Sequence, residues 1–236
     1  RDLRMSRGLG DVYKRQIYVH DMSARRDTMN CCLFDVAHVL SGGFEMGNIW
    51  YNEPKSLDVA FDVIGDIVLS AASQQYGGFT VPSVDLILEP YAEKSYAKAL
   101  AKYISLGVSP VTAEEEAYKD VKKEFEQGFQ GWEYKFNTVA SSRGDYPFIT
   151  VTAGTGTGRF SRMATIAMLE VRKGGQGKAD HKKPVLFPKI VFLYDENLHG
   201  PGKPLEDVFE AGVQCSAKTM YPDWLSLTCL LYTSDA

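Results

Sequence analysis

The sequence lacks the marks of a membrane, secreted or nucleic-acid-binding protein. No apolar run approaches the ~18 residues of a membrane-spanning helix, and charged residues rather than an apolar segment stand at the start of the chain. The net charge of −4 provides no overall attraction to nucleic acid. We therefore expect a protein of the cytoplasm with no membrane or nucleic-acid partner.

Cysteine is also scarce. There are four such residues, Cys31, Cys32, Cys215 and Cys229. Adjacent cysteines rarely bridge each other and no Cys-x-x-Cys pair occurs, so the sequence predicts neither a disulfide framework nor a metal site. Cys215 lies in a helical pattern, where a cysteine is usually a small core residue.

Apolar residues are plentiful, at 44% of the chain, and they fall into alternating helix and strand patterns. Strands are predicted over 148–152 and 188–194, and the second is a continuous apolar run typical of a parallel strand buried on both faces. Helices are predicted over 57–75, from Ser83 to 104 with a kink at Pro90, from a capping box at Thr112 and Glu115 to 127, over 160–171 and over 205–218. This alternation predicts an α/β fold.

A glycine-rich loop, Gly154 to Gly158, separates a predicted strand from a predicted helix. Backbone amides at such a junction can bind a phosphate. The spacing matches neither the P-loop nor the full dinucleotide-binding pattern, so a tight turn without a ligand is the competing interpretation.

The segment around Cys31 allows two interpretations. A cysteine beside an apolar stretch is usually a small core residue. A functional thiol needs a polar group nearby, and Asn30 and His20 could serve. Periodicity alone leaves both interpretations open.

Long ordered stretches of the chain resemble one known family. They are NCCLFDVAHVL, GGFEMGNIWYNEPKSLDVAFDVIGDIVLSAASQQYGGFTVP, ILEPYAEKSY, GWEYKFNT, RGDYPFITVT, GGQGK, PVLFPKIVFLYDENLHG and CSAKTMYPDW. Together they resemble the catalytic chain of the anaerobic (class III) ribonucleoside-triphosphate reductases, from about residue 17 to residue 228. The resemblance implies a partial α/β barrel of the type that ribonucleotide reductases share with other glycyl radical enzymes.

The resemblance also implies a reaction, the reduction of ribonucleoside triphosphates to deoxyribonucleoside triphosphates. A thiyl radical, generated by a glycyl radical, takes hydrogen from C3′ of the ribose, and the 2′-hydroxyl leaves as water. Formate is the implied reductant, and ATP and deoxynucleoside triphosphates are the implied effectors. A homodimer and a radical-SAM activating enzyme are implied as well. The family's thiyl cysteine, glycyl radical site and zinc-binding cysteines map to regions outside this chain.

The resemblance assigns roles to particular residues. Cys31, which follows Asn30, matches the family's reducing cysteine, and Asn30 and His20 match residues that bind substrate. Because Cys32 is adjacent, the assignment could shift by one position. Four further residues are implied to contact the effector: Glu53, Ser56, Tyr91 and Lys98.

The ends of the chain differ in composition from its middle. Residues 1–16 and 229–236 look like translated sequencing adapter, so we expect them to be non-native, with 17–228 forming an internal part of the catalytic barrel domain. Two alternatives stay open. One is a glycyl radical enzyme with another substrate, and the other is a non-catalytic module that binds nucleotides or forms dimers.

Overall fold

A five-stranded parallel sheet organises the chain. The computed structural model describes residues 31–75, 77–139 and 148–228. The strands lie in the order β1-β4-β5-β8-β9, and each neighbouring pair is parallel. Their bounds are β1 Cys32–Leu33, β4 Phe79–Val81, β5 Ile149–Ala153, β8 Lys189–Tyr194 and β9 Asp223–Ser226. The strand order follows the chain order, which is how the wall of an α/β barrel is built, and the predicted α/β fold is confirmed.

Helices connect the successive strands. They are α2 Val36–Leu40 and α3 Leu57–Ala72 after β1, α4 Val84–Ser105 and α5 Pro110–Thr138 after β4, α6 Arg159–Gly174 after β5, and α7 Glu206–Thr219 after β8. Two hairpins, β2 Phe44–Met46 with β3 Ile49–Tyr51 and β6 Gln176–Lys178 with β7 His181–Lys183, complete the elements. Because parallel crossovers are right-handed, strands in sequential order receive their helices on one face.

Burial of the strands agrees with a sheet covered on one face. One face carries apolar side chains that are almost fully buried: Phe79, Val81, Ile149, Val151, Ala153, Ile190 and Phe192. The side chains that alternate with them, including Thr80, Thr150 and Lys189, are only half-buried. The core of the molecule therefore lies between the helices and one face of the sheet, and the other face is more polar and more open.

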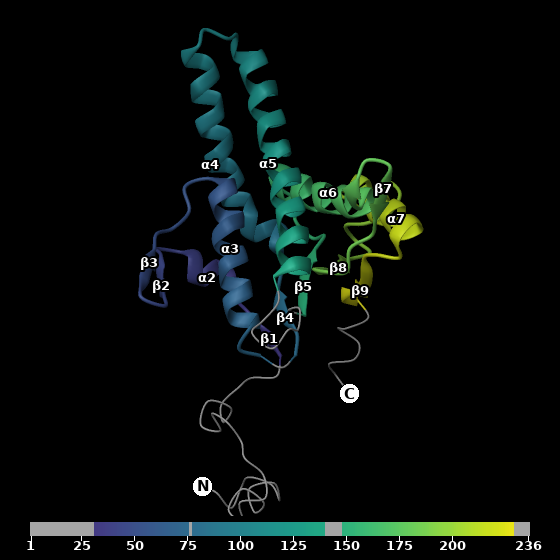
Figure 1. Cartoon of the computed structure of the whole chain (residues 1–236). Helices are drawn as coiled ribbons and strands as arrows, with labels where there is room; N and C mark the ends of the chain where they lie inside the picture. Colours follow the sequence, from purple (N-terminus) through teal and green to yellow (C-terminus); the bar gives the residue numbers. More distant parts are fainter. Residues whose placement is uncertain (1–30, 76, 140–147, 229–236) are drawn as a thin grey trace, which may run out of the picture.

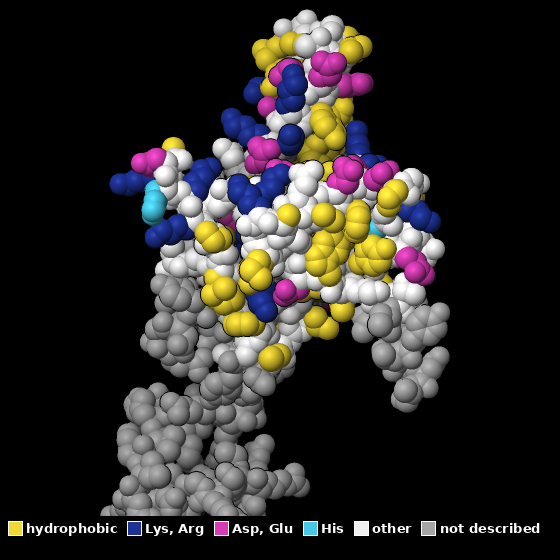
Figure 2. Space-filling view, turned by 90° about the vertical axis from the view of Figure 1, so that its right-hand side faces the viewer, with side chains coloured by type: hydrophobic (Ala, Val, Ile, Leu, Met, Phe, Trp, Pro, Cys, Tyr) yellow, Lys and Arg dark blue, Asp and Glu magenta, His cyan; other side chains and the backbone are white. Residues whose placement is uncertain are grey.

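A long pair of antiparallel helices, α4 and α5, projects from the body of the molecule (Figure 1). In Figure 2 this pair rises above the rest, with hydrophobic, acidic and basic side chains interspersed on its surface. The predicted start of α5 at a Thr112–Glu115 capping box was wrong. The side chain of Ser109 accepts a hydrogen bond from the Thr112 amide at 3.3 Å, and Pro110 occupies the first helical position, which it favours.

The predicted end of α5 near residue 127 was also wrong, since the helix continues to Thr138. Its second half buries aromatic residues at helical spacing: Phe125, Phe129, Trp132 and Phe136. Phe61 of α3 packs edge-on against Trp132, whose indole N–H donates to the Phe61 carbonyl at 2.9 Å. This packing supports the second half of the helix, although its sequence is rich in charge.

The start of α3 is stabilised by a side chain of another helix. Ser56 is the N-cap residue, but its hydroxyl bonds to Asp58 instead of capping the helix. The Leu57 amide donates to the Ser95 hydroxyl of α4 at 2.9 Å. The helix also ends at Ala72, three residues before the predicted Gln75. A side chain distant in sequence thus satisfies one of the donors at this helix terminus.

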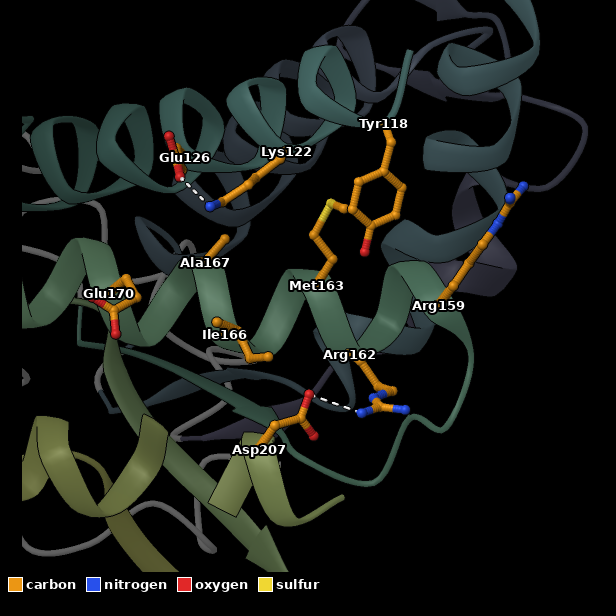
Figure 3. Close-up of a pocket in the computed structure, with 10 residues that line it drawn as sticks. All are labelled: Tyr118, Lys122, Glu126, Arg159, Arg162, Met163, Ile166, Ala167, Glu170 and Asp207. Carbon is orange, nitrogen blue, oxygen red and sulfur yellow. Dashed lines mark hydrogen bonds and ion pairs between the residues drawn. The ribbon is translucent and has the colours of Figure 1, made fainter. Parts of the chain in front are cut away.

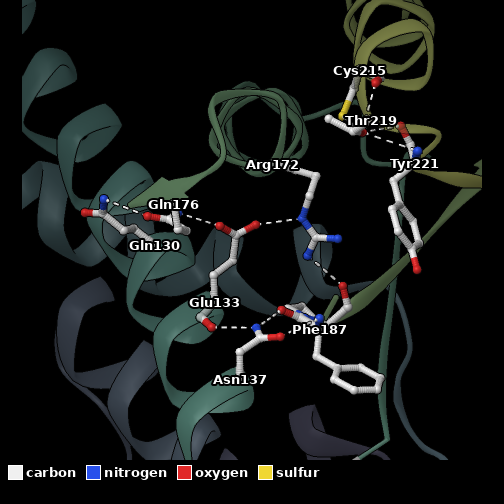
Figure 4. Close-up of polar contacts among 10 residues, drawn as sticks. Gln130, Glu133, Asn137, Arg172, Gln176, Phe187, Cys215, Thr219 and Tyr221 are labelled. Carbon is white, nitrogen blue, oxygen red and sulfur yellow. Dashed lines mark hydrogen bonds and ion pairs between the residues drawn. The ribbon is translucent and has the colours of Figure 1, made fainter. Parts of the chain in front are cut away.

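A buried ion pair joins α5 and α6 beside the residue that precedes β8 (Figure 4). Arg172 is fully buried, and its Nε lies 2.7 Å from a Glu133 carboxylate oxygen. The same guanidinium donates to the Pro188 carbonyl at 2.7 Å, and Gln176 donates to the second Glu133 oxygen. Cys215 of α7 is buried close by, which confirms its predicted structural role.

Candidate functional site

The two adjacent cysteines occupy different environments. Cys32 lies in β1 opposite Phe79 and packs partly against the core, and its sulfur accepts a hydrogen bond from the Gln75 side chain at 2.9 Å. Cys31 is exposed, and its sulfur accepts from the Gly78 amide at 3.2 Å. Because successive residues of an extended chain point to opposite faces, Cys31 lies on the side of Leu33, which is 77% exposed.

The two thiols therefore face different surroundings. Cys32 points toward the core and the helices. Cys31 points toward the face of the sheet that the described helices leave uncovered. The other two predicted active-site residues, Asn30 and His20, lie outside the described residues.

The glycine-rich loop already holds an acidic side chain of the protein itself. Asp85, the second residue of α4, is completely buried, and one of its carboxylate oxygens accepts from the amides of Gly154 and Gly156, both at 3.1 Å. Burial raises the pKa of Asp85, and the two amide hydrogen bonds oppose that rise. The carboxylate thus occupies the position that a phosphate would take at these amides, which favours the tight-turn interpretation.

A buried histidine supports the same loop. The Asp195 amide donates to His199 Nδ1 at 3.0 Å, so the proton lies on Nε2. That nitrogen then donates to the Gly154 carbonyl at 2.8 Å. Both nitrogens are used in local structure, so His199 is a structural residue.

The four residues predicted to contact an effector lie near one another where α3 begins beside α4. Glu53 forms an ion pair with Lys94 at 2.6 Å, and the Lys94 ammonium lies 4.9 Å from the centre of the Tyr91 ring. The hydrogen bond from Lys94 lowers the pKa of Glu53. Burial raises the pKa of Tyr91, and the Glu53 charge adds to that rise.

The other two predicted effector residues, Ser56 and Lys98, both interact with Asp58. The pKa of Asp58 is lowered first by the hydrogen bond from Ser56 and further by the charge of Lys98. Lys94, which the sequence interpretation missed, lies one helical turn before Lys98 and three residues after Tyr91. That spacing places all three side chains on one side of α4. It is the feature of the sequence that could have identified Lys94.

A cavity of about 760 Å³ lies among α5, α6 and α7 (Figure 3). Its two arginines have carboxylate partners: Arg162 with Asp207 at 2.8 Å and Arg159 with Glu93 of α4, whereas Lys122 lies 3.9 Å from Glu126. The remaining lining residues are Tyr118, Met163, Ile166, Ala167 and Glu170. Both arginines are paired internally and three carboxylates, Glu126, Glu170 and Asp207, line the same cavity, so its charges do not favour an anion.

Two kinds of feature are absent from the described ranges. No cluster of three or more His, Cys, Asp or Glu side chains suited to a metal ion occurs in 31–75, 77–139 and 148–228. In the same ranges no helix combines the length and apolar character needed to cross a membrane.

Comparison with known proteins identifies the family. The family model described as anaerobic ribonucleoside-triphosphate reductase matches residues 11–235. The chain belongs to this family. The match extends into both terminal segments, whose adapter origin stays a prediction.

Several proteins named anaerobic ribonucleoside-triphosphate reductase are similar to this reductase chain. That of Enterobacteria phage T4 is 38% identical over 214 residues, which is 89% of this chain and 34% of the phage protein. Those of Haemophilus influenzae and Escherichia coli are 38% and 34% identical, covering 90% and 96% of this chain. The chain thus spans about a third of the length of these relatives.

Solved structures of an anaerobic ribonucleotide reductase share the fold. The Thermotoga maritima enzyme with citrate in its active site gives a TM-score of 0.59 at 16% identity, covering 95% of this chain and 42% of that one. The complex of the same enzyme with dATP and CTP gives 0.56 at 15% identity, over 89% and 35%. These similarities extend over nearly the whole of this chain.

Proposed function

We propose that this reductase chain supplies part of the catalytic barrel of an enzyme that reduces ribonucleoside triphosphates to deoxyribonucleoside triphosphates, with formate as reductant. Cys31 is its reducing thiol. The observation that carries the proposal is the position of Cys31 in a chain of this family: it is exposed on the uncovered sheet face, whereas Cys32 packs against the core.

The chemistry requires a protonated thiol at this position. A hydroxide ion is a poor leaving group, so the ribose 2′-hydroxyl needs a positioned acid to leave as water. A thiol on the open face can donate that proton and, once reprotonated by solvent, a hydrogen atom to the sugar. Formate then returns a hydrogen atom to the resulting thiyl sulfur, and the electron left on the formate carbon completes the reduction as carbon dioxide leaves. The Gly78 amide, 3.2 Å from the Cys31 sulfur, orients it.

The remaining participants belong to the complete enzyme. We propose a cytoplasmic homodimer, activated by a radical-SAM enzyme, with ATP and deoxynucleotides as effectors. The glycyl radical and a zinc site lie in regions of the reductase outside this chain.

The chain alone should form no deoxynucleotide. Catalysis needs a thiyl cysteine, a glycyl radical and the reducing cysteine in contact with one ribose, and this chain provides only the third. We expect no product when the purified chain is incubated anaerobically with activating enzyme, formate and nucleoside triphosphate. Turnover above that of a Cys31→Ser control would contradict the assignment of the radical residues.

Removing the charge of Lys98 should weaken effector binding. In the full-length reductase, Lys98→Gln removes one charged contact to the effector phosphates, so we expect its Kd to rise by roughly tenfold or more, with the basal rate unchanged. Gln is preferable to Glu because a new carboxylate would also repel Asp58. Binding is measured by calorimetry with a deoxynucleoside triphosphate.

The matched control for that measurement is Lys102→Gln. Lys102 is an exposed lysine one turn further along α4, and we expect its replacement to leave effector affinity unchanged. Equal affinity of wild type and Lys98→Gln would argue against an effector site at the α3–α4 junction.

A further inference from the structure

The uncovered face of the sheet carries polar side chains that could line a binding cavity. One row of side chains crosses four strands in register: Leu33, Thr80, Thr150 and Lys189. The opposite face presents only apolar side chains in the central strands. Hydroxyl and ammonium groups in an apolar core would need partners. Although Leu33, Val191 and Leu193 on this face are apolar, the three adjacent positions Thr80, Thr150 and Lys189 suit contact with a polar ligand.

Lys189 is the cation of this row, and its protein partner is a weak one. Its ammonium lies 3.7 Å from a carboxylate oxygen of Asp223 on the neighbouring strand, longer than the ~2.7–2.9 Å of a charge-assisted hydrogen bond. It also lies 5.6 Å from the centre of the Phe148 ring. The Lys189 side chain is 34% exposed and that of Asp223 55% exposed. The ammonium therefore keeps the capacity to bind another anion.

Lys189 and Cys31 lie on the same face and toward the same end of the sheet. Lys189 is the first residue of β8, and Cys31 immediately precedes β1. Three strand spacings of ~4.8 Å separate β1 from β8, roughly 14 Å between backbones along the sheet. Formate has to meet the Cys31 sulfur directly, so a cation on β8 is too distant to hold it there. The phosphates of a nucleotide whose ribose lies at Cys31 extend away from that sulfur and can reach β8.

We propose that Lys189 binds the phosphate groups of the nucleoside triphosphate substrate, with the hydroxyls of Thr80 and Thr150 lining the path between Lys189 and Cys31. This inference rests on the proposed function. It adds a binding residue that is distant in sequence from the reducing cysteine. Without the phosphates, the nearest anionic group of the described chain is the Asp223 carboxylate at 3.7 Å.

The test is Lys189→Met in the full-length reductase, because methionine keeps the length of the side chain without its charge. We expect both the Kd for a ribonucleoside triphosphate, measured by equilibrium dialysis, and its KM to rise by roughly tenfold or more. The KM for formate should not change. Lys189→Arg should recover part of the affinity, since it restores the positive charge.

Asp223→Asn is the matched control for a purely structural ion pair. If Lys189 serves only to pair with Asp223, both variants should lower the thermal midpoint alike and leave nucleotide affinity unchanged, which would overturn the proposal. A rise in the KM for formate instead of the nucleotide would also overturn it. If the wild-type enzyme binds the nucleotide tightly but forms no deoxynucleotide, the proposed function is wrong. The Lys189 site is then decided separately, by comparing the nucleotide Kd of the wild type with that of Lys189→Met.

Discussion

Replacing Cys31 by Ser should abolish deoxynucleotide formation by the full-length reductase while its glycyl radical still forms. A serine hydroxyl is a much weaker acid than a thiol and cannot supply the reducing hydrogen atom. Loss of the positioned acid alone is expected to cost about 10²–10⁴-fold in rate, and loss of the reductant should remove the remainder. Product is measured by chromatography under anaerobic conditions, and the radical by electron paramagnetic resonance.

Cys32→Ser is the matched control because it makes the same change one residue away. Cys32 faces the helices and accepts its hydrogen bond from Gln75, so we expect this variant to keep most of its activity. The reverse pattern, with Cys32→Ser inactive and Cys31→Ser active, would show that the assignment is wrong by one position.

Removing Glu133 should produce the largest loss of stability. Glu133→Ala leaves the guanidinium of Arg172, which is 0% exposed, without its carboxylate partner. Breaking a buried ion pair in this way costs about 3–5 kcal/mol. Urea unfolding of the full-length protein should therefore show a large fall in the transition midpoint.

Glu170→Ala is the control for the loss of an ion pair as such. Glu170 pairs with Lys173 on the same helix, α6, but its side chain is 46% exposed, so its loss should cost no more than about 1 kcal/mol. Replacing both members of the buried pair, as Glu133→Leu with Arg172→Met, should restore part of the stability. Equal effects of Glu133→Ala and Glu170→Ala would contradict this account of the pair.

The longer elements of the fold could be predicted because their patterns are local. The periodicity of 57–75 and the apolar run of 188–194 predicted α3 and β8 to within a few residues. Strands β1, β4 and β9 were missed because two to four residues are too few to show alternation. They form strands because they extend a sheet whose other members are distant in sequence.

The candidate site depends on the same distant pairings. Which cysteine faces the open side is fixed by the pairing of Cys32 with Phe79, and the sequence around Cys31 gives no sign of it. The glycine-rich loop is filled by Asp85, 69 residues before Gly154. Lys189 lies at the end of a strand whose neighbours place it in line with Thr150 and Thr80. Local patterns could not predict any of these contacts.

Differential alkylation of the two adjacent cysteines tests the central claim most directly. The full-length reductase is treated anaerobically with iodoacetamide, with and without a ribonucleoside triphosphate, and the modified peptides are quantified by mass spectrometry. We predict that Cys31 is alkylated readily in the free enzyme and is protected by the nucleotide, whereas Cys32 reacts slowly in both conditions. Protection of Cys32, or alkylation of Cys31 that the nucleotide leaves unchanged, would contradict the claim that Cys31 faces the substrate.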